Sequence, residues 1–136
     1  MGAWDVSSFG NDTACDWAWE LKESSDLSVV EETIDRVFDT AEDGYIEAPT
    51  GEEAIAACET IARLKGRFGI RNSYTKDVDK WIAAHPLQPS PEMVEKANNA
   101  LDLIMSDNSE LRQLYEESDS FAEWQASVSD LRQRMN

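Results

Sequence analysis

The chain has 136 residues, with 28 acidic and 12 basic side chains and a formal net charge of -16 at pH 7. Hydrophobic residues make up 41% of it and include five tryptophans, which excludes a disordered acidic tail and predicts a single folded domain over residues 1–136. The negative field repels nucleic acid and anionic membranes, so we expect neither as a partner.

The first two predicted helices are rich in carboxylates. Asn11 or Asp12 caps a helix that extends to about Lys22, with Trp19 beside its apolar stripe. A second helix covers about residues 27–42, because its apolar residues recur with the 3.6-residue period of a helix. The opposite face of this second helix is acidic.

The third predicted helix is almost entirely apolar. Thr50 and Glu53 have the spacing of a capping box and predict a start from which the helix extends to about Lys65. Gly66 then ends it, because glycine adopts the left-handed conformation that closes a helix. An apolar surface on most sides indicates a central helix surrounded by the others. We expect four of its side chains to be deeply buried, namely Ile55, Cys58, Ile61 and Ala62.

Four further helices complete the prediction. Thr75 caps a short one that ends before Pro86, and Ser90, followed by proline, opens the next. A break at residues 107–109 precedes a short sixth helix, and a seventh begins at about Ser120. Apolar residues nowhere alternate as they do in strands. The predicted fold class is therefore all-α, a compact bundle of about six to seven short helices around a central alanine-rich helix.

Several stretches of the sequence match the pattern of one known family. They are Met1-Gly2-Ala3-Trp4 with Asn11-Asp12 and Asp16-Trp17, Tyr45 to Pro49, Asp107 to Ser118, and Trp124 with Leu131-Arg132. Together they resemble a bacterial family named domain of unknown function four-two-five-nine, over nearly the whole chain. That name implies no activity, cofactor or partner.

The sequence offers no set of residues for catalysis or metal binding. His85 is the single histidine, so the chain alone can form neither a histidine triad nor a histidine-based metal site. Cys15 and Cys58 lack the spacing of metal ligands and the density of a secreted scaffold, which predicts reduced thiols and a cytoplasmic location. No glycine-rich phosphate loop is present. We therefore predict no catalytic residue, no metal and no cofactor.

One segment of the chain is basic. Residues 61–90 contain six basic and two acidic side chains, whereas residues 1–60 contain two basic and sixteen acidic ones. The stretch from Gly66 to Arg71, with Tyr74 and Trp81, is the nearest to an anion-binding or single-strand-binding loop, but the charge of -16 opposes nucleic acid. The alternative is that these bases neutralise acidic neighbours in the folded chain.

The acidic N-terminal half suggests a function in protein binding. Our leading hypothesis is a non-enzymatic acidic protein, a monomer or homodimer, that neutralises a basic protein partner in the manner of an immunity protein, antitoxin or nucleic-acid mimic. The predicted partner-binding residues are Trp4, Phe9, Asp12, Asp16, Glu32, Asp35, Asp39 and Glu42.

Several alternatives remain open from the sequence, among them a purely structural or assembly role and an acidic charge that serves solubility alone. Trp4 and Phe9 either present a recognition surface or form a hydrophobic staple onto the first helix. The whole chain is alternatively a small enzyme or ligand-binding domain with a helix-lined pocket of carboxylates and tryptophan. A deep pocket holding carboxylates of raised pKa would favour this second function, and a flat acidic surface would favour the first.

Overall fold

A computed structural model describes residues 5–136 of the chain. Within these residues there are seven α-helices and no strand; one isolated bridge joins Ile46 and Ser109. The helices are α1 (Asp12–Lys22), α2 (Ser28–Glu42), α3 (Ala48–Leu64), α4 (Lys76–Ala84), α5 (Pro91–Ile104), α6 (Glu110–Glu116) and α7 (Phe121–Met135). The predicted all-α class is confirmed.

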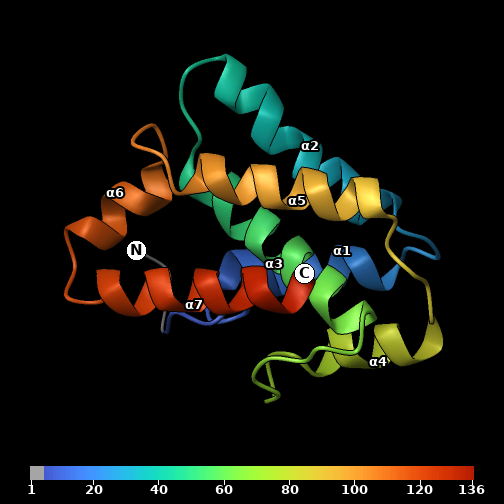
Figure 1. Cartoon of the computed structure of the whole chain (residues 1–136). Helices are drawn as coiled ribbons and strands as arrows, with labels where there is room; N and C mark the ends of the chain where they lie inside the picture. Colours follow the sequence, from blue (N-terminus) through green and yellow to red (C-terminus); the bar gives the residue numbers. More distant parts are fainter. Residues whose placement is uncertain (1–4) are drawn as a thin grey trace.

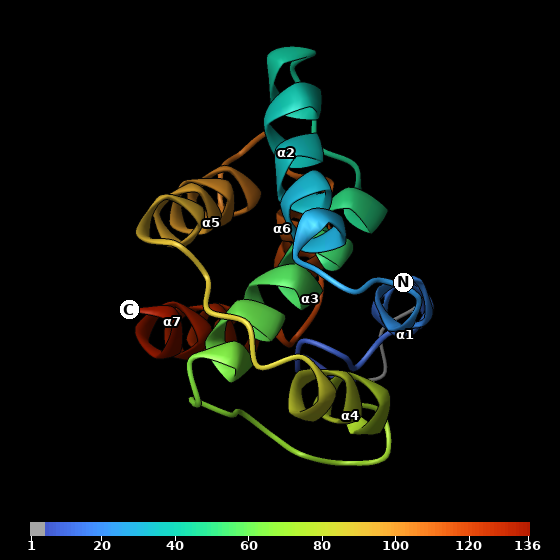
Figure 2. The same cartoon turned by 90° about the vertical axis from the view of Figure 1, so that its right-hand side faces the viewer.

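Helix α3 lies at the centre and contacts each of the other six helices. Figure 2 shows α2 above it, α1 to one side, α5 and α7 to the other, and α4 below. Small side chains along α3 allow this close approach, because the distance between packed helices depends on the side chains at the contact. Ile55, Cys58, Ile61 and Ala62 are all buried, as predicted.

Local capping signals set several of the helix starts. The side chain of Asn11 accepts a hydrogen bond from the N–H of Ala14 at 2.7 Å, and that of Ser90 accepts one from Met93 at 3.1 Å. These side chains satisfy backbone donors that have no partner inside the helix. Both predicted caps are therefore confirmed.

The start of α3 differs from the prediction. The helix begins at Ala48 rather than at Thr50, and its flanking residue Glu47 makes no side-chain capping bond. Instead, the carboxylate of Glu110 accepts the N–H of Ala48 at 2.7 Å. The capping box prediction is wrong because a side chain from a distant part of the chain supplies the acceptor.

The same region joins two loops that are far apart in sequence. The N–H of Ile46 donates to the carbonyl of Asn108 at 2.9 Å, and the N–H of Glu110 donates to the carbonyl of Ile46 at 2.8 Å. The hydroxyl of Tyr45 donates to the side chain of Gln113 at 2.9 Å. These bonds fix the approach to α3 against the start of α6.

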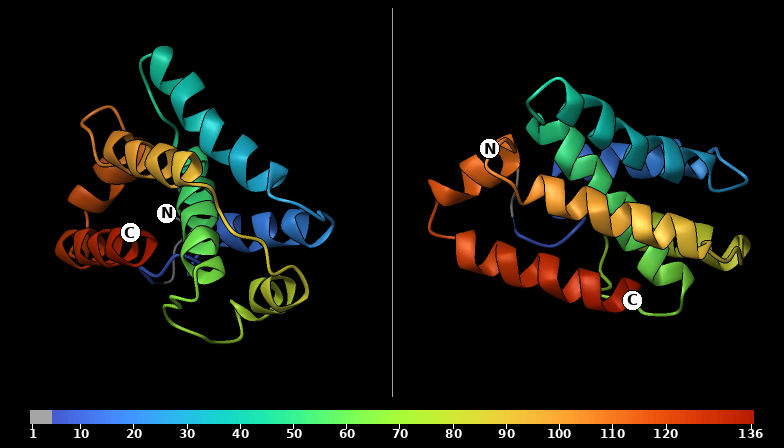
Figure 3. Two further views of the ribbon diagram at one scale, coloured as in Figure 1. Left: turned by 45° about the vertical axis from the view of Figure 1, so that its right-hand side comes forward. Right: turned by 45° about the horizontal axis from the view of Figure 1, so that its top comes forward.

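The acidic helix α2 and the basic segment lie at different ends of the molecule. Helix α2 is at one end, while α4 and the loop of residues 65–75 are at the other, on the far side of α3 (Figures 1 and 3). No helix in residues 5–136 is both long enough and apolar enough to cross a membrane.

The cap supplied by Glu110 leads to the first prediction. Replacing Glu110→Ala leaves an N–H at the start of α3 without its partner, so the free energy of unfolding should fall by about 1 kcal/mol in urea titrations. Glu95→Ala, at an exposed position of α5, is the matched control and should change stability far less. Equal losses in the two variants would show that Glu110 does not act as a cap.

The two thiols give a second prediction. Cys15 and Cys58 are both free, and burial raises the pKa of Cys58 to about 12 because the thiolate is poorly solvated there. A reducing agent should therefore leave the melting temperature unchanged, and a thiol-specific reagent should label the partly buried Cys15 before Cys58 in the native chain. A lower melting temperature on reduction would contradict this.

Candidate functional site

The centre of the molecule contains charged side chains that the sequence analysis did not predict. Glu59 and Arg63 are one turn apart on α3 and are only 3% and 2% exposed. The helix was expected to be apolar on most sides, yet its last two turns carry a buried ion pair. The sequence signal for this pair was the opposite charge of two residues that lie four positions apart on one helix.

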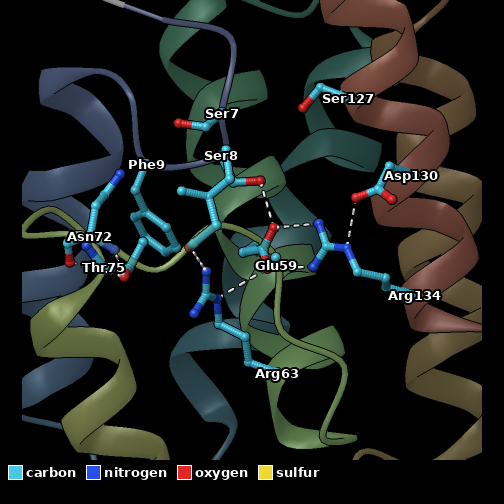
Figure 4. A pocket seen from close by; sticks show the side chains of 12 residues that line it. Ser7, Ser8, Phe9, Glu59, Arg63, Asn72, Thr75, Ser127, Asp130 and Arg134 are labelled. Atoms are coloured by element: carbon cyan, nitrogen blue, oxygen red, sulfur yellow. Dashed lines mark hydrogen bonds and ion pairs between the residues drawn. The ribbon is translucent and has the colours of Figure 1, made fainter.

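Glu59 accepts hydrogen bonds from three side chains (Figure 4). Arg134 of α7 donates two in a bidentate arrangement, at 2.7 and 2.9 Å. Arg63 donates from Nε at 3.0 Å, and the hydroxyl of Ser8 donates at 2.9 Å. Both carboxylate oxygens are thus occupied by donors from α3, α7 and the N-terminal loop.

Arg63 extends the cluster towards α4. Its Nη1 donates to Asp79 at 2.5 Å, and its Nη2 donates to the carbonyl of Ile70. Asp79 also accepts from the hydroxyl of Thr75 at 3.0 Å. We call Ser8, Glu59, Arg63, Asp79 and Arg134 the central ion network. In the described chain, no buried side-chain nitrogen or oxygen lacks a hydrogen-bond partner.

The two arginines determine the charge state of Glu59. Burial raises the pKa of this carboxyl, but the hydrogen bonds and charge of Arg134, with the charge of Arg63, outweigh burial and hold the pKa below its ordinary value. The same bonds raise the pKa of Arg134. Glu59 is therefore a fixed anion, unsuited to accept or release a proton at neutral pH.

The cavity beside this network is small and polar. It has a volume of about 60 Å³ and is lined partly by the hydroxyls of Ser7, Thr75 and Ser127. A second, near Glu52 and Tyr115, has about 10 Å³. Burial raises the pKa of Glu52, the feature expected of a catalytic carboxyl, but pockets for small molecules usually measure about 300–1,000 Å³. These two cavities have room for a few water molecules and exclude a substrate.

Metal-ligand geometry is absent from the described chain. Within residues 5–136, no three His, Cys, Asp or Glu side chains converge as ligands for an ion. His85 instead stacks on Trp81, with ring centroids 4.6 Å apart.

The outer face of α1 combines carboxylates with an exposed tryptophan. Asp12, Asp16 and Glu23 share one side of this helix with Trp19, because these positions lie within about 60° at 100° per residue. Trp19 is 62% exposed, and the ammonium of Lys22 lies 4.1 Å from its ring centroid. A helical wheel could have identified this arrangement, whereas the sequence analysis placed Trp19 only beside the core stripe.

The predicted acidic face of α2 is mostly free. Glu32, Asp39 and Glu42 are exposed and form no ion pair with any described residue. Asp35 is different, since the ammonium of Lys96 on α5 donates to it at 2.8 Å. Asp35 remains half-exposed, but part of its charge is balanced by Lys96 within the fold.

Helices α1 and α2 are neighbours on α3, joined by a hydrogen bond of 2.8 Å from the indole of Trp17 to Thr33. We define the acidic surface as the free residues on their outer faces. These are Asp12, Asp16, Trp19, Glu23, Glu32, Asp39 and Glu42.

The predicted aromatic contacts of the N-terminal segment need a correction. Phe9 is only 2% exposed and belongs to the main apolar core, so it cannot contact a partner. Its ring is excluded from water because the loop of residues 5–10 folds back on α1 and α3. Trp4, the other predicted aromatic, lies outside the described residues. Trp81 of the basic segment is buried too.

Comparison with known proteins identifies the family. The model of the family described as Domain of unknown function (DUF4259) matches residues 2–127. The chain belongs to this family. The match to DUF4259 includes the whole acidic surface and stops before Arg134, which pairs with Glu59. No curated protein and no solved structure matches the chain.

The central ion network leads to a third prediction. Glu59→Gln removes the buried carboxylate shared by Arg63 and Arg134, which then keep only Asp79 and Asp130 as counter-ions, so the free energy of unfolding at neutral pH should fall by about 3 kcal/mol. Glu123→Gln, at an exposed position of α7, serves as the control.

The effect should depend on pH in a defined direction. Because the folded pKa of Glu59 lies below the ordinary 4.5, ionised Glu59 stabilises the fold above that pH, and this contribution is lost as the pH falls through the folded value. Urea titrations at several pH values should therefore show the difference between wild type and Glu59→Gln shrinking in acid. A difference that stays constant would rule out the charge of Glu59 as its cause.

Proposed function

We propose that this chain is a non-enzymatic binding protein whose acidic surface binds a basic protein partner. The observation that carries the proposal is Trp19, which is 62% exposed and shares its helix face with Asp12, Asp16 and Glu23. The indole of Trp19 lies outside the apolar core and contacts the ammonium of Lys22 on the same helix. Tryptophan is also among the residues that contribute most to protein interfaces.

The surrounding carboxylates fit a cationic partner. None of the carboxylates in the acidic surface has an ion-pair partner among the described residues, so their charges are available to a second molecule. Neighbouring positions on a helix face are about 5–6 Å apart, within the screening length of about 8 Å at physiological salt. The carboxylates therefore act jointly on lysines or arginines of a partner.

The parts of this surface have different energetic roles. Exposed charges each contribute about 1 kcal/mol or less, and they mainly raise the rate of association. A buried aromatic anchor contributes about 2 kcal/mol or more, mainly by slowing dissociation. We propose that the carboxylates guide the encounter and that Trp19 holds the complex.

The free cysteines support a reducing, cytoplasmic location for this protein.

Two matched triple variants test the electrostatic role. Affinity capture at low salt, with elution by high salt, would first supply a candidate basic partner. The triple change Glu32→Lys, Asp39→Lys, Glu42→Lys should then slow association with the purified partner and flatten its salt dependence. Glu92→Lys, Glu95→Lys, Glu123→Lys changes net charge equally from exposed positions of α5 and α7, and is the matched control. If both triple variants slow association equally, the effect comes from net charge alone, and the position of the carboxylates on α2 has no specific role.

The anchor is tested by Trp19→Ala. This change should weaken binding by about 2 kcal/mol, expressed mainly in the dissociation rate, because the indole is lost from the centre of the interface. Stability should change little, since Trp19 is largely exposed in the free chain. Unchanged dissociation of the Trp19→Ala variant would place recognition elsewhere on the molecule.

A further inference from the structure

The basic side chains of the chain fall into two groups. Eight of the twelve form ion pairs with carboxylates, and the ammonium of Lys65 donates to the carbonyl of Met135. The remaining three, Arg67, Lys76 and Lys80, have no such partner among residues 5–136. In a chain with 28 carboxylates, the bases left unpaired all belong to one short segment.

Two of these lysines line a surface depression. It has a volume of about 540 Å³ and is open to solvent along α4 and the preceding loop. Its lining residues are Arg71, Asn72, Ser73, Lys76, Asp79, Lys80 and Ala83. It is larger than the two cavities at the core, and it is an open, shallow surface rather than an enclosed pocket.

The depression is positively charged despite the presence of Asp79. The carboxylate of Asp79 is engaged by Arg63 at 2.5 Å and by Thr75 at 3.0 Å, on the side of the central ion network. Arg71 is 3.7 Å from the same carboxylate but its side chain is 64% exposed. Arg71, Lys76 and Lys80 therefore present charge that Asp79 only partly balances.

We infer that this depression binds a compact phosphate-bearing small molecule through Arg71, Lys76 and Lys80. A phosphate ester carries up to about two negative charges at neutral pH and offers several strong acceptor oxygens. A guanidinium and two ammonium groups are the donors that suit these oxygens, and the hydroxyl of Ser73 and the amide of Asn72 add neutral donors at the rim.

The size of the anion follows from the charge distribution. At physiological salt, charges beyond about 8 Å are largely screened, so a small anion in the depression responds mainly to the three bases around it. A polyanion would extend beyond them and meet the rest of a chain with a charge of -16. A compact ligand is therefore favoured over nucleic acid.

Neutralisation within the fold does not account for these lysines. That interpretation of the basic segment holds for Arg63, which pairs with Glu59 and Asp79. It fails for Lys76 and Lys80, which are exposed and contact no carboxylate in the described chain. The inference is independent of the proposed function, because the depression shares no residue with the acidic surface.

Titration of the full chain with inorganic diphosphate at physiological salt, followed by NMR of backbone amides, tests the inference. Saturable shifts should be concentrated in residues 70–84. The double variant Lys76→Ala, Lys80→Ala should bind about tenfold more weakly or worse, since two charged donors are lost. Arg36→Ala, Lys96→Ala removes the same charge from α2 and α5 and should bind like wild type.

Three results would overturn the inference. The first is the absence of saturable shifts with diphosphate, and the second is an equal loss of affinity in both double variants. The third is tighter binding of single-stranded oligothymidylate or polyglutamate than of diphosphate at the same salt, which would assign the site to a polymer. Circular dichroism spectra and melting curves of both double variants should match those of wild type, so that any loss of affinity is measured on folded protein.

Discussion

The pairing of Glu59 with Arg63 and Arg134 is the interaction on which the rest of the structure depends. Six helices surround α3, so the charges of Glu59 and Arg63 in its C-terminal turns are removed from water. An isolated charge there would cost several kcal/mol, and only a counter-charge with complete hydrogen bonding offsets that cost. The donors come from α7 and the N-terminal loop, and Arg63 reaches α4 through Asp79. One carboxylate thereby connects four separate parts of the chain.

With the interior charges paired, the excess negative charge lies on the exterior. It is unevenly distributed, because α1 and α2 carry unpaired carboxylates while the loop of residues 65–75 and α4 carry unpaired bases. Helix α2 and the basic segment are at different ends of the molecule, with α3 between them, whereas α1 packs against α4 (Figure 2). The DUF4259 description names no activity, so the two proposals rest on these surfaces rather than on the family or the fold.

Much of the secondary structure could be predicted because it depends on neighbours within about four residues. Asn11 and Ser90 cap the helices that follow them, and the periodic apolar residues of α2 and α7 define both helices. The central place of α3 followed from its composition, since a helix that is apolar on most sides needs cover on most sides. The acidic face of α2 could also be predicted from the sequence, because helix geometry fixes which residues share a face.

The candidate sites depended on which helix faces meet, and this information is not local. Arg134 pairs with Glu59 across 75 residues, Lys96 with Asp35 across 61, and Glu110 caps α3 across 62. Each partner had other charged residues of suitable sign nearer in sequence. The sequence by itself determined the helices, their apolar faces and the uneven charge. Only the tertiary structure decided which charges are paired inside the fold and which stay free to bind, because ion pairing requires atoms within a few ångströms, whatever their distance along the chain.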